Sequence, residues 1–435
     1  MEQARLLVGI LGVAVAGAVV LCASPPCAGA DAGAEAIPVT TMHPDEALKP
    51  FDDEMLAYMR ARHIPGGALA VSRGGKLVLS RGYGWADKEA RVQVAPDALF
   101  RIASISKPIT SAAVMRLIQD SDGKLTLDTP IFDILKVKPH LSPGAKADPR
   151  LATITIREVL QHTGGWDRDK SFDPMFRPLE IAKDLGAKSP AGPWEIIRYT
   201  LGFPLDHDPG STYAYSNFGY CVLGRLVEKL SGMPYEKFVR ERILAPLGIT
   251  RMRIGHTLRE ERAEGEVTYY DPGMGGDVMG PDPAKQVPAP YGTFYLEAMD
   301  AHGGWLASAS DLVRFACAFD DPSHCPILKP ESVAEMFARP QGSAGYDAGG
   351  KPLAAYYGCG WLVRPTGDGK ANHWHTGSLP GTFTLLVRRH DGLNWAAVFN
   401  QRADASGLSY DDIDPALHRA ADRVTAWPEY DLFKK

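Results

Sequence analysis

The sequence is short of the residues that mark metal centres, redox sites and nucleic-acid binding. Its 435 residues include six cysteines, with no Cys-x-x-Cys pair and no spacing typical of metal ligands. A formal net charge of −5 does not favour binding to the phosphate backbone of a nucleic acid. Gly-x-Ser-x-Gly, the nucleophile turn of α/β-hydrolases, is also absent. We therefore expect no metal, no cofactor and no nucleic-acid partner.

The composition is that of an ordinary soluble globular protein. Hydrophobic residues make up 45% and charged residues 23%. A chain of this length buries a large core and has room for two or three structural units. We find no internal repeats.

The N-terminus carries the long hydrophobic run of the chain. Leu6 to Ala23 is uninterrupted and apolar, and Ala28-Gly29-Ala30 follows as a small-x-small cleavage pattern. This predicts a signal peptide over 1–30 and an exported protein, periplasmic or extracellular. The positive charge before the run is weak, and residues 6–23 are long enough to remain as a membrane anchor, which is the alternative.

Two of the cysteines bear on the compartment. Cys317 and Cys325 flank a short polar loop, so an oxidising environment could pair them. Cys221 and Cys359 lie in apolar contexts and are expected to be buried thiols.

Strand patterns occupy the two ends of the chain and helical patterns occupy the middle. We predict an α+β fold: an antiparallel sheet built from both chain ends, flanked by terminal helices, with an inserted all-helical region. Residues 31–43 form an Ala-rich linker in this interpretation. The domain spans 44–435, with an α/β part at 44–104 and 300–435 and a helical part at 105–299. Besides the helix that begins at Ser104, the predicted helices are 43–62, 124–135, 154–161, 193–201, 218–231, 234–243, 311–319 and 414–424. The Gly-rich turn at 73–76 predicts a hairpin.

The stretch from Leu99 to Gln119 organises the rest of the chain. Ser104-x-x-Lys107 stands where an apolar helical pattern begins, so both side chains are expected on one face of the first turn. A hydroxyl beside free backbone N–H groups suits nucleophilic chemistry and a developing oxyanion. The pattern is short enough to occur by chance, and an N-cap serine with a solvated lysine is the structural alternative.

Two further motifs follow in order. Tyr215-Ser216-Asn217 begins a predicted helix, and His375-Thr376-Gly377 lies on a predicted strand. A serine hydroxyl needs a base, which Lys107 supplies if its pKa is lowered and Tyr215 if a cation stabilises its phenolate. Asn217 can hold the substrate and the lysine, while the backbone N–H groups of Ser104 and Ser378 would form an oxyanion hole.

Each motif also has a structural interpretation. Tyr215 can be a turn aromatic, Asn217 a helix N-cap and His375-Thr376-Gly377 a strand edge. A second His-Thr-Gly at 162–164 follows a helix and is expected to be only its stop. The order of the three motifs, each on the element that its role needs, favours the catalytic interpretation.

These motifs and their surroundings resemble the class C β-lactamase-related serine hydrolases, a group of penicillin-binding D,D-peptidases, D-aminopeptidases and β-lactamase-fold esterases. The likeness extends from about Pro44 to Asn400 and includes IPGGALAV, FRIASISK, ITIREVLQHTGG, PGSTYAYSNFGYCVLGRLVE and GGWLASASDLVRF. It implies a β-lactamase/transpeptidase-like fold and an acyl-enzyme mechanism on an ester or amide substrate. The implied roles are acylated nucleophile for Ser104, proton transfer for Lys107 and Tyr215, and substrate or oxyanion binding for Asn217, His375, Thr376, Gly377 and Ser378.

Position 375 departs from the family pattern. Class C β-lactamases carry lysine there, whereas an imidazole is largely neutral at pH 7 and anchors a substrate carboxylate poorly. No Ser-Asp-Asn motif is present either. The sequence therefore favours an esterase or D-peptidase over a dedicated β-lactamase.

Two other functions stay open at this point. The fold could serve as a non-catalytic scaffold or ligand sensor, although the intact motifs disfavour that reading. A metal hydrolase using His373 and His375 lacks an evident third ligand. Two long polar segments, 166–192 and 265–297, are expected to shape the pocket.

Overall fold

The computed structural model describes residues 36–434. The predicted signal peptide at 1–30, the alternative anchor at 6–23 and the first part of the 31–43 linker lie outside this range. Residues 37–434 belong to one compact unit. Among the described residues, no helix is both long and apolar enough to cross a membrane.

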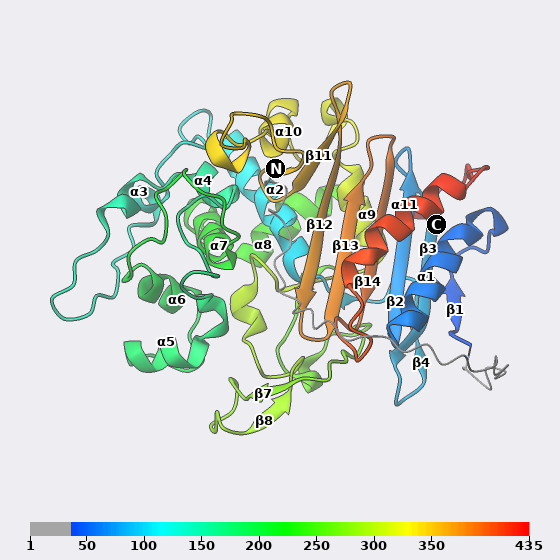
Figure 1. Ribbon diagram of the computed structural model, residues 1–435, viewed down its shortest axis with the longest axis horizontal. Coiled ribbons are helices and arrows are strands. Elements are labelled where there is room, and N and C mark those ends of the chain that lie inside the picture. Colours follow the sequence, from blue (N-terminus) through cyan, green and yellow to red (C-terminus); the bar gives the residue numbers. More distant parts are fainter. Residues whose placement is uncertain (1–35, 435) are drawn as a thin grey trace, which may run out of the picture. The chain divides into compact units, whose positions relative to one another are not determined.

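A nine-stranded sheet built from both ends of the chain is the frame of the unit, as predicted (Figure 1). Its order is β1-β3-β2-β14-β13-β12-β11-β10, with β4 paired to β3, and the pairs are antiparallel. The chain ends meet where β2 pairs with β14, Ala70 opposite Ala396. The strands are β1 (Val39–Thr41), β2 (Gly66–Arg73), β3 (Lys76–Asp87), β4 (Val92–Gln93), β10 (Tyr356–Tyr357), β11 (Leu362–Gly367), β12 (Lys370–Leu379), β13 (Thr382–Arg388) and β14 (Leu393–Phe399).

The 31–43 segment is not wholly a linker. Its last residues form β1, in which Val39 pairs with Tyr83 of β3. The three residues of β1 are too few to show the alternation of apolar and polar residues that predicts a strand. The strand forms because the edge of β3 offers backbone groups for pairing.

Helices cover both faces of the sheet. The terminal helices α1 (Lys49–Ala61) and α11 (Ile413–Arg423) pack together in front of it in Figure 1. Phe51, Met55 and Leu417 are fully buried there against β-sheet residues such as Trp395. On the other face, α9 (Ala309–Cys317) packs against β2 and β14. Burial of this apolar surface is the main stabilisation of the layers.

The helical region lies beside the sheet and is mostly as predicted (Figure 1). Helix α1 begins at Lys49 rather than at 43, because Asp45 caps a 3₁₀ turn, Glu46–Leu48, that precedes it. The 166–192 segment contains a helix, α5, that its polar composition concealed. The remaining helices are α2 (Ser106–Gln119), α3 (Ile131–Leu135), α4 (Ile156–Leu160), α5 (Pro178–Leu185), α6 (Pro193–Thr200), α7 (Asn217–Ser231), α8 (Tyr235–Val239) and α10 (Pro330–Phe337).

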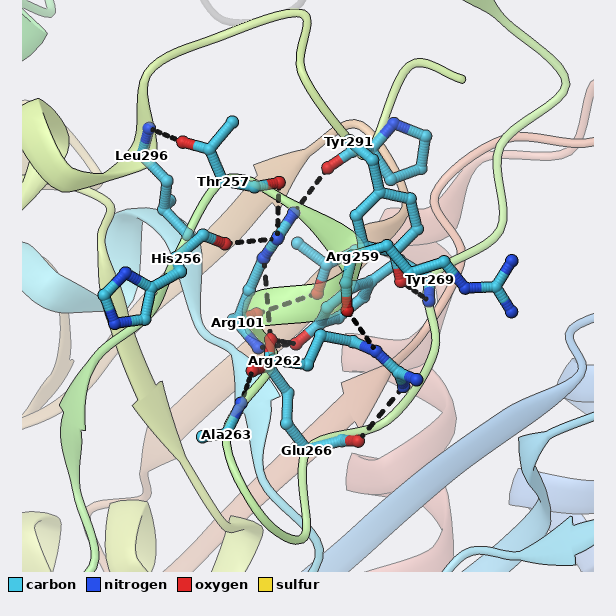
Figure 2. Close-up of polar contacts among 12 residues, drawn as sticks. Arg101, His256, Thr257, Arg259, Arg262, Ala263, Glu266, Tyr269, Tyr291 and Leu296 are labelled. Atoms are coloured by element: carbon cyan, nitrogen blue, oxygen red, sulfur yellow. Dashed lines mark hydrogen bonds and ion pairs between the residues drawn. The ribbon is translucent and has the colours of Figure 1, made fainter. Parts of the chain in front are cut away.

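The 265–297 segment is anchored by Arg101, which is fully buried in β5 (Phe100–Arg101) (Figure 2). Its guanidinium donates to the carbonyls of Pro290 at 2.6 Å and His256 at 2.7 Å, and it pairs with buried Glu266 at 3.7 Å. The strand pair β7 (Met274–Gly276) and β8 (Gln286–Pro288) lies within the segment. Because Arg101 stands three residues before Ser104, the segment is tied to the chain that carries the serine.

A small three-stranded sheet holds β5, the strand that precedes Ser104. β5 pairs with β9 (Trp305–Ala307), which also pairs with β6 (Arg253–Ile254).

Cys317 and Cys325 do not form the disulfide considered from the sequence, since both are free thiols. The Cys317 thiol contacts the Ser72 hydroxyl at 3.1 Å instead. Cys221 and Cys359 are buried thiols, as predicted.

Candidate active site

Ser104 lies in a 3₁₀ turn, Ala103–Ile105, immediately before α2, and not in the first helical turn that the sequence predicted. Ala103 has φ of 47°, a left-handed conformation that costs a residue with a Cβ free energy. Within 101–110 Ser104 alone is partly exposed. The turn therefore raises the hydroxyl out of an otherwise buried run.

Neighbouring strands fix this turn from both sides. The Thr384 hydroxyl of β13 donates to the Ile102 carbonyl at 3.0 Å, and Thr382 donates to the Arg101 carbonyl at 2.8 Å. The Ile102 N–H donates to the carbonyl of Trp305 in β9 at 3.0 Å. These bonds hold the strained backbone before Ser104 in one position.

Lys107 is completely buried and contacts Ser104, as the spacing predicted. Its Nζ lies 3.1 Å from Ser104 Oγ, 2.8 Å from Asn217 Oδ1 and 3.1 Å from the His302 carbonyl oxygen. Burial lowers the pKa of Lys107 well below its usual value, the charge of Arg168 lowers it further, and Asp173 partly opposes this. The site thus disfavours the ammonium form.

In its neutral form, the Lys107 amine is oriented by these three contacts. The Asn217 Oδ1 and His302 carbonyl oxygens can only accept hydrogen bonds, so they take the two N–H groups of a neutral amine. The remaining lone pair then faces Ser104 Oγ. This arrangement lets Lys107 accept the proton of the serine hydroxyl.

Asn217 is the first residue of α7, and Asp173 fixes its side-chain amide. Its Nδ2 donates to Asp173 Oδ2 at 2.7 Å, which fixes the amide with Oδ1 toward Lys107. Ser216, rather than Asn217, caps the helix, because its hydroxyl accepts from the Gly219 N–H. The N-cap interpretation of Asn217 is therefore wrong.

Tyr215 completes the group around the serine. Burial raises the pKa of Tyr215, while a hydrogen bond with Ser104 and the charge of Arg168 lower it, and the net shift is upward. Lys107 Nζ lies 4.7 Å and the Arg168 guanidinium carbon 4.9 Å from the centre of the tyrosine ring. Tyr215 is thus a neutral phenol that is hydrogen-bonded to Ser104 and able to donate a proton.

His162, expected only to end a helix, packs against this tyrosine. Its ring centre is 4.4 Å from that of Tyr215 and 4.5 Å from that of Tyr357. Its Nδ1 accepts the Ser216 N–H at 3.1 Å. His162 follows the C-cap of α4, Gln161, with φ of 58°, and it also packs against the tyrosine of the second motif.

His375 lies beside Tyr215 and has no free nitrogen. Nδ1 donates to the Thr376 carbonyl at 2.6 Å, so Nε2 accepts from the Tyr357 hydroxyl at 3.0 Å. Burial, and then the charge of Lys107, lower the pKa of His375 to about 3. The imidazole is therefore neutral at physiological pH.

His373 does not join His375 as a metal pair. Its ring lies 4.2 Å from that of Phe337, and its Nδ1 lies 3.4 Å from Arg388. Within 36–434, the group of side chains with metal-ligating geometry is His256, Glu261 and Glu297, outside the three motifs.

Gly377 brings β12 against the turn of Ser104. A Cβ built on this glycine would lie 2.2 Å from the Ile102 carbonyl oxygen and 3.1 Å from the Ser104 nitrogen. Only glycine permits that approach. Ser378, the next residue, is exposed. Its N–H as the second oxyanion donor stays a prediction.

The sequence missed residues that reach the site from elsewhere. Arg168 and Asp173 come from the 166–192 segment, His302 precedes β9, and Tyr357 lies in β10. In the sequence, the length of the polar 166–192 segment was the one feature that pointed to Arg168 and Asp173. A cavity of 280 Å³ lies beside Asn217, lined in part by Arg168, Asp173, Phe172 and Phe203.

Comparison with known proteins gives the family. The Beta-lactamase family model matches residues 51–418. Penicillin-binding protein 4 of Amycolatopsis lactamdurans is 31% identical over 360 residues, 78% of this chain and 82% of that protein. Esterase EstB of Burkholderia gladioli is 29% identical over 359 residues, 77% of this chain and 86% of the esterase.

Solved structures agree on the fold. An octameric penicillin-binding protein homologue from Pyrococcus abyssi matches with a TM-score of 0.64 and 24% identity, over 89% of this chain and 79% of that one. A D-amino acid amidase from Ochrobactrum anthropi SV3 matches with a TM-score of 0.64 and 23% identity, over 87% of this chain and 99% of the amidase. The predicted β-lactamase/transpeptidase-like fold is confirmed. The chain therefore belongs to the Beta-lactamase family, and it is a serine hydrolase of the β-lactamase and penicillin-binding protein type.

Proposed function

We propose that the protein hydrolyses an ester or amide through an acyl-enzyme on Ser104. The arrangement around Lys107 Nζ carries this proposal, because two acceptors leave the amine lone pair facing Ser104 Oγ at 3.1 Å. Lys107 takes the serine proton as the oxygen attacks the acyl carbon. Tyr215, a neutral phenol hydrogen-bonded to the serine, passes a proton to the leaving group and regains one from Lys107. Water then hydrolyses the acyl-enzyme and restores the Ser104 hydroxyl. The backbone N–H groups of Ser104 and Ser378 receive the oxyanion.

We further propose that esters or D-amino acid amides and peptides are better substrates than β-lactams. Both nitrogens of His375 are engaged and its pKa is lowered to about 3, so position 375 provides no cation for a substrate carboxylate. A family member of 29% identity is an esterase, which supports an ester substrate.

The test of the acyl-enzyme is covalent labelling. A fluorophosphonate probe is expected to modify the wild-type protein at Ser104, and p-nitrophenyl esters are expected to turn over. Ser104→Ala should lose both reactions, with Ser106→Ala, whose buried hydroxyl lies on α2, as the folded control. Equal labelling of Ser104→Ala would contradict the proposal, and a wild type without adduct or turnover would favour the non-catalytic scaffold. A panel of short-chain esters, D-amino acid amides, D-Ala-D-Ala peptides and a chromogenic cephalosporin then ranks the substrates.

Tyr215→Phe is expected to slow acylation at least about 100-fold, the common scale for a lost acid or base. The ring and its contacts with His162 remain, so the loss belongs to the hydroxyl. Stopped-flow acylation with a p-nitrophenyl ester measures it. Tyr213→Phe, on the same segment, is the matched control and should stay near wild type. A Tyr215→Phe rate within fivefold of wild type would remove the phenol from the mechanism.

We also propose that the protein is exported, on the strength of the apolar run at 6–23 and the small-x-small pattern at 28–30. Cell fractionation and N-terminal sequencing of the full chain test this. A mature chain starting near Asp31 supports cleavage, and an intact N-terminus in the membrane fraction supports the anchor. Full-length protein in the cytosol would refute export.

A further inference from the structure

Arg168 is a cation at the site that the proposed reaction does not use. It lies near the start of the 166–192 segment and lines the cavity beside Asn217. Its guanidinium carbon lies 4.9 Å from the Tyr215 ring centre. Its side chain is 40% exposed. Arg168 therefore lies close to the tyrosine that contacts Ser104 and is open to solvent.

The guanidinium is poorly neutralised. Within 36–434 its ion pair is a 3.9 Å contact to Asp169, whose side chain is 92% exposed. Nearby carboxylates already have other partners: Asp173 accepts from Asn217 at 2.7 Å and Asp167 from His207 at 2.9 Å. An arginine with unused donors in a fork suits a carboxylate better than any other side chain does.

The other basic side chains near the site are buried, neutral or hydrogen-bonded. Lys107 is buried and surrounded by three oxygen atoms. Lys170 donates to the Asp206 carbonyl at 2.7 Å. His375, at the position where class C β-lactamases carry lysine, is neutral. Among the described residues that line this cavity, Arg168 is the cation whose donors no other residue takes up in a hydrogen bond.

We propose that Arg168 is a specificity-determining residue that binds a carboxylate of the ester or amide substrate. The inference rests on the proposed acyl-enzyme function and names its substrate class: anionic acyl donors or anionic leaving groups. The carboxylate enters beside Asn217 and replaces the weak Asp169 contact. The cavity there, with Phe172 and Phe203 in its wall, accepts the apolar part of the same substrate.

A purely electrostatic role is the competing explanation. The charge of Arg168 lowers the pKa values of Tyr215 and Lys107, so its loss would disturb the chemical step for every substrate. Binding of a carboxylate affects anionic substrates alone and acts mainly on KM. The two explanations therefore differ in which substrates respond.

Two matched pairs of esters separate them. In the first, mono-p-nitrophenyl glutarate is compared with its methyl ester, which places the charge on the acyl side. In the second, 4-carboxyphenyl butyrate is compared with 4-(methoxycarbonyl)phenyl butyrate, which places it on the leaving group. Steady-state kcat and KM are measured for the purified wild type and for Arg168→Gln, Arg168→Lys and Arg177→Gln, on the pH plateau of each protein.

Arg168→Gln is expected to lower kcat/KM for the anionic ester of at least one pair about tenfold or more, mainly through KM, with the neutral ester within threefold. Arg168→Lys should recover part of the preference. Arg177→Gln removes a 44% exposed arginine of the same segment and should change neither ester.

Other outcomes overturn the inference. Equal losses for anionic and neutral esters would assign Arg168 to the electrostatics of Tyr215 and Lys107, and no change in either pair would remove it from the site. Hydrolysis of neutral esters alone by the wild type would also refute it, while Ser104 labelling would still uphold the proposed function. Absence of labelling and of all turnover would instead fail the proposed function itself.

Discussion

Lys107→Met is expected to slow acylation of Ser104 at least about 100-fold, the usual effect of removing a general base. Methionine retains the length and the buried apolar stem of the side chain but has no nitrogen to take the serine proton. Lys107→Ala should lose at least as much, because it also leaves a cavity among buried residues. The rate of fluorophosphonate labelling under single-turnover conditions measures the effect. Thermal unfolding of both variants separates lost chemistry from lost fold.

The pH profile tests the same base in the unmodified protein. Because burial lowers the pKa of Lys107, the neutral amine forms below the usual lysine range, and kcat/KM should rise with pH through that lowered value. The raised pKa of Tyr215 keeps the phenol protonated, so the alkaline limb should lie above pH 10. Asp173 raises the Lys107 pKa, so Asp173→Asn should move the acid limb to lower pH. Labelling of Lys107→Met within tenfold of wild type would rule out this role.

Gly377→Ala is expected to reduce acylation about 100- to 1000-fold, the scale of a lost oxyanion donor. The new methyl group would lie 2.2 Å from the Ile102 carbonyl oxygen and 2.3 Å from Thr384 Oγ1. Neither can yield easily, since Thr384 Oγ1 holds the Ile102 carbonyl at 3.0 Å. Strand β12 must therefore move away from Ser104, and the oxyanion donors lose their alignment. The same steric clash should lower the thermal midpoint.

Gly303→Ala is the matched control. Its added Cβ would meet its nearest neighbours at 3.9 Å, an ordinary contact, although the residue also lies near the site. The measurements are acylation rate and thermal midpoint for both variants. Wild-type acylation by a folded Gly377→Ala protein would show that β12 does not form the oxyanion hole.

Local sequence was sufficient where periodicity and backbone chemistry act over a few residues. Alternating apolar residues on either side of Gly74-Gly75 predicted the β2–β3 hairpin, and both glycines adopt positive φ there. Ser104 and Lys107, three residues apart, lie 3.1 Å from each other even though Ser104 belongs to a 3₁₀ turn. Short-range geometry brings them together in either kind of turn.

Pairing across the chain was beyond such reasoning. β1 depends on the edge of β3, and α5 depends on packing against α6 more than on its own polar sequence. His162 was interpreted as a helix stop because nothing in its neighbourhood predicts a tyrosine from 53 residues later against its ring. Only the folded structure shows that His162 also packs against Tyr215.

By itself the sequence determined the three motifs, their order and the sheet built from both chain ends. These follow from residue type and periodicity, which need no knowledge of distant neighbours. The tertiary structure alone decided the protonation of the site. Burial lowers the pKa values of Lys107 and His375, and the charges of Arg168 and Lys107, respectively, lower them further. Desolvation and partner geometry set a pKa, and both exist only once remote segments have packed together.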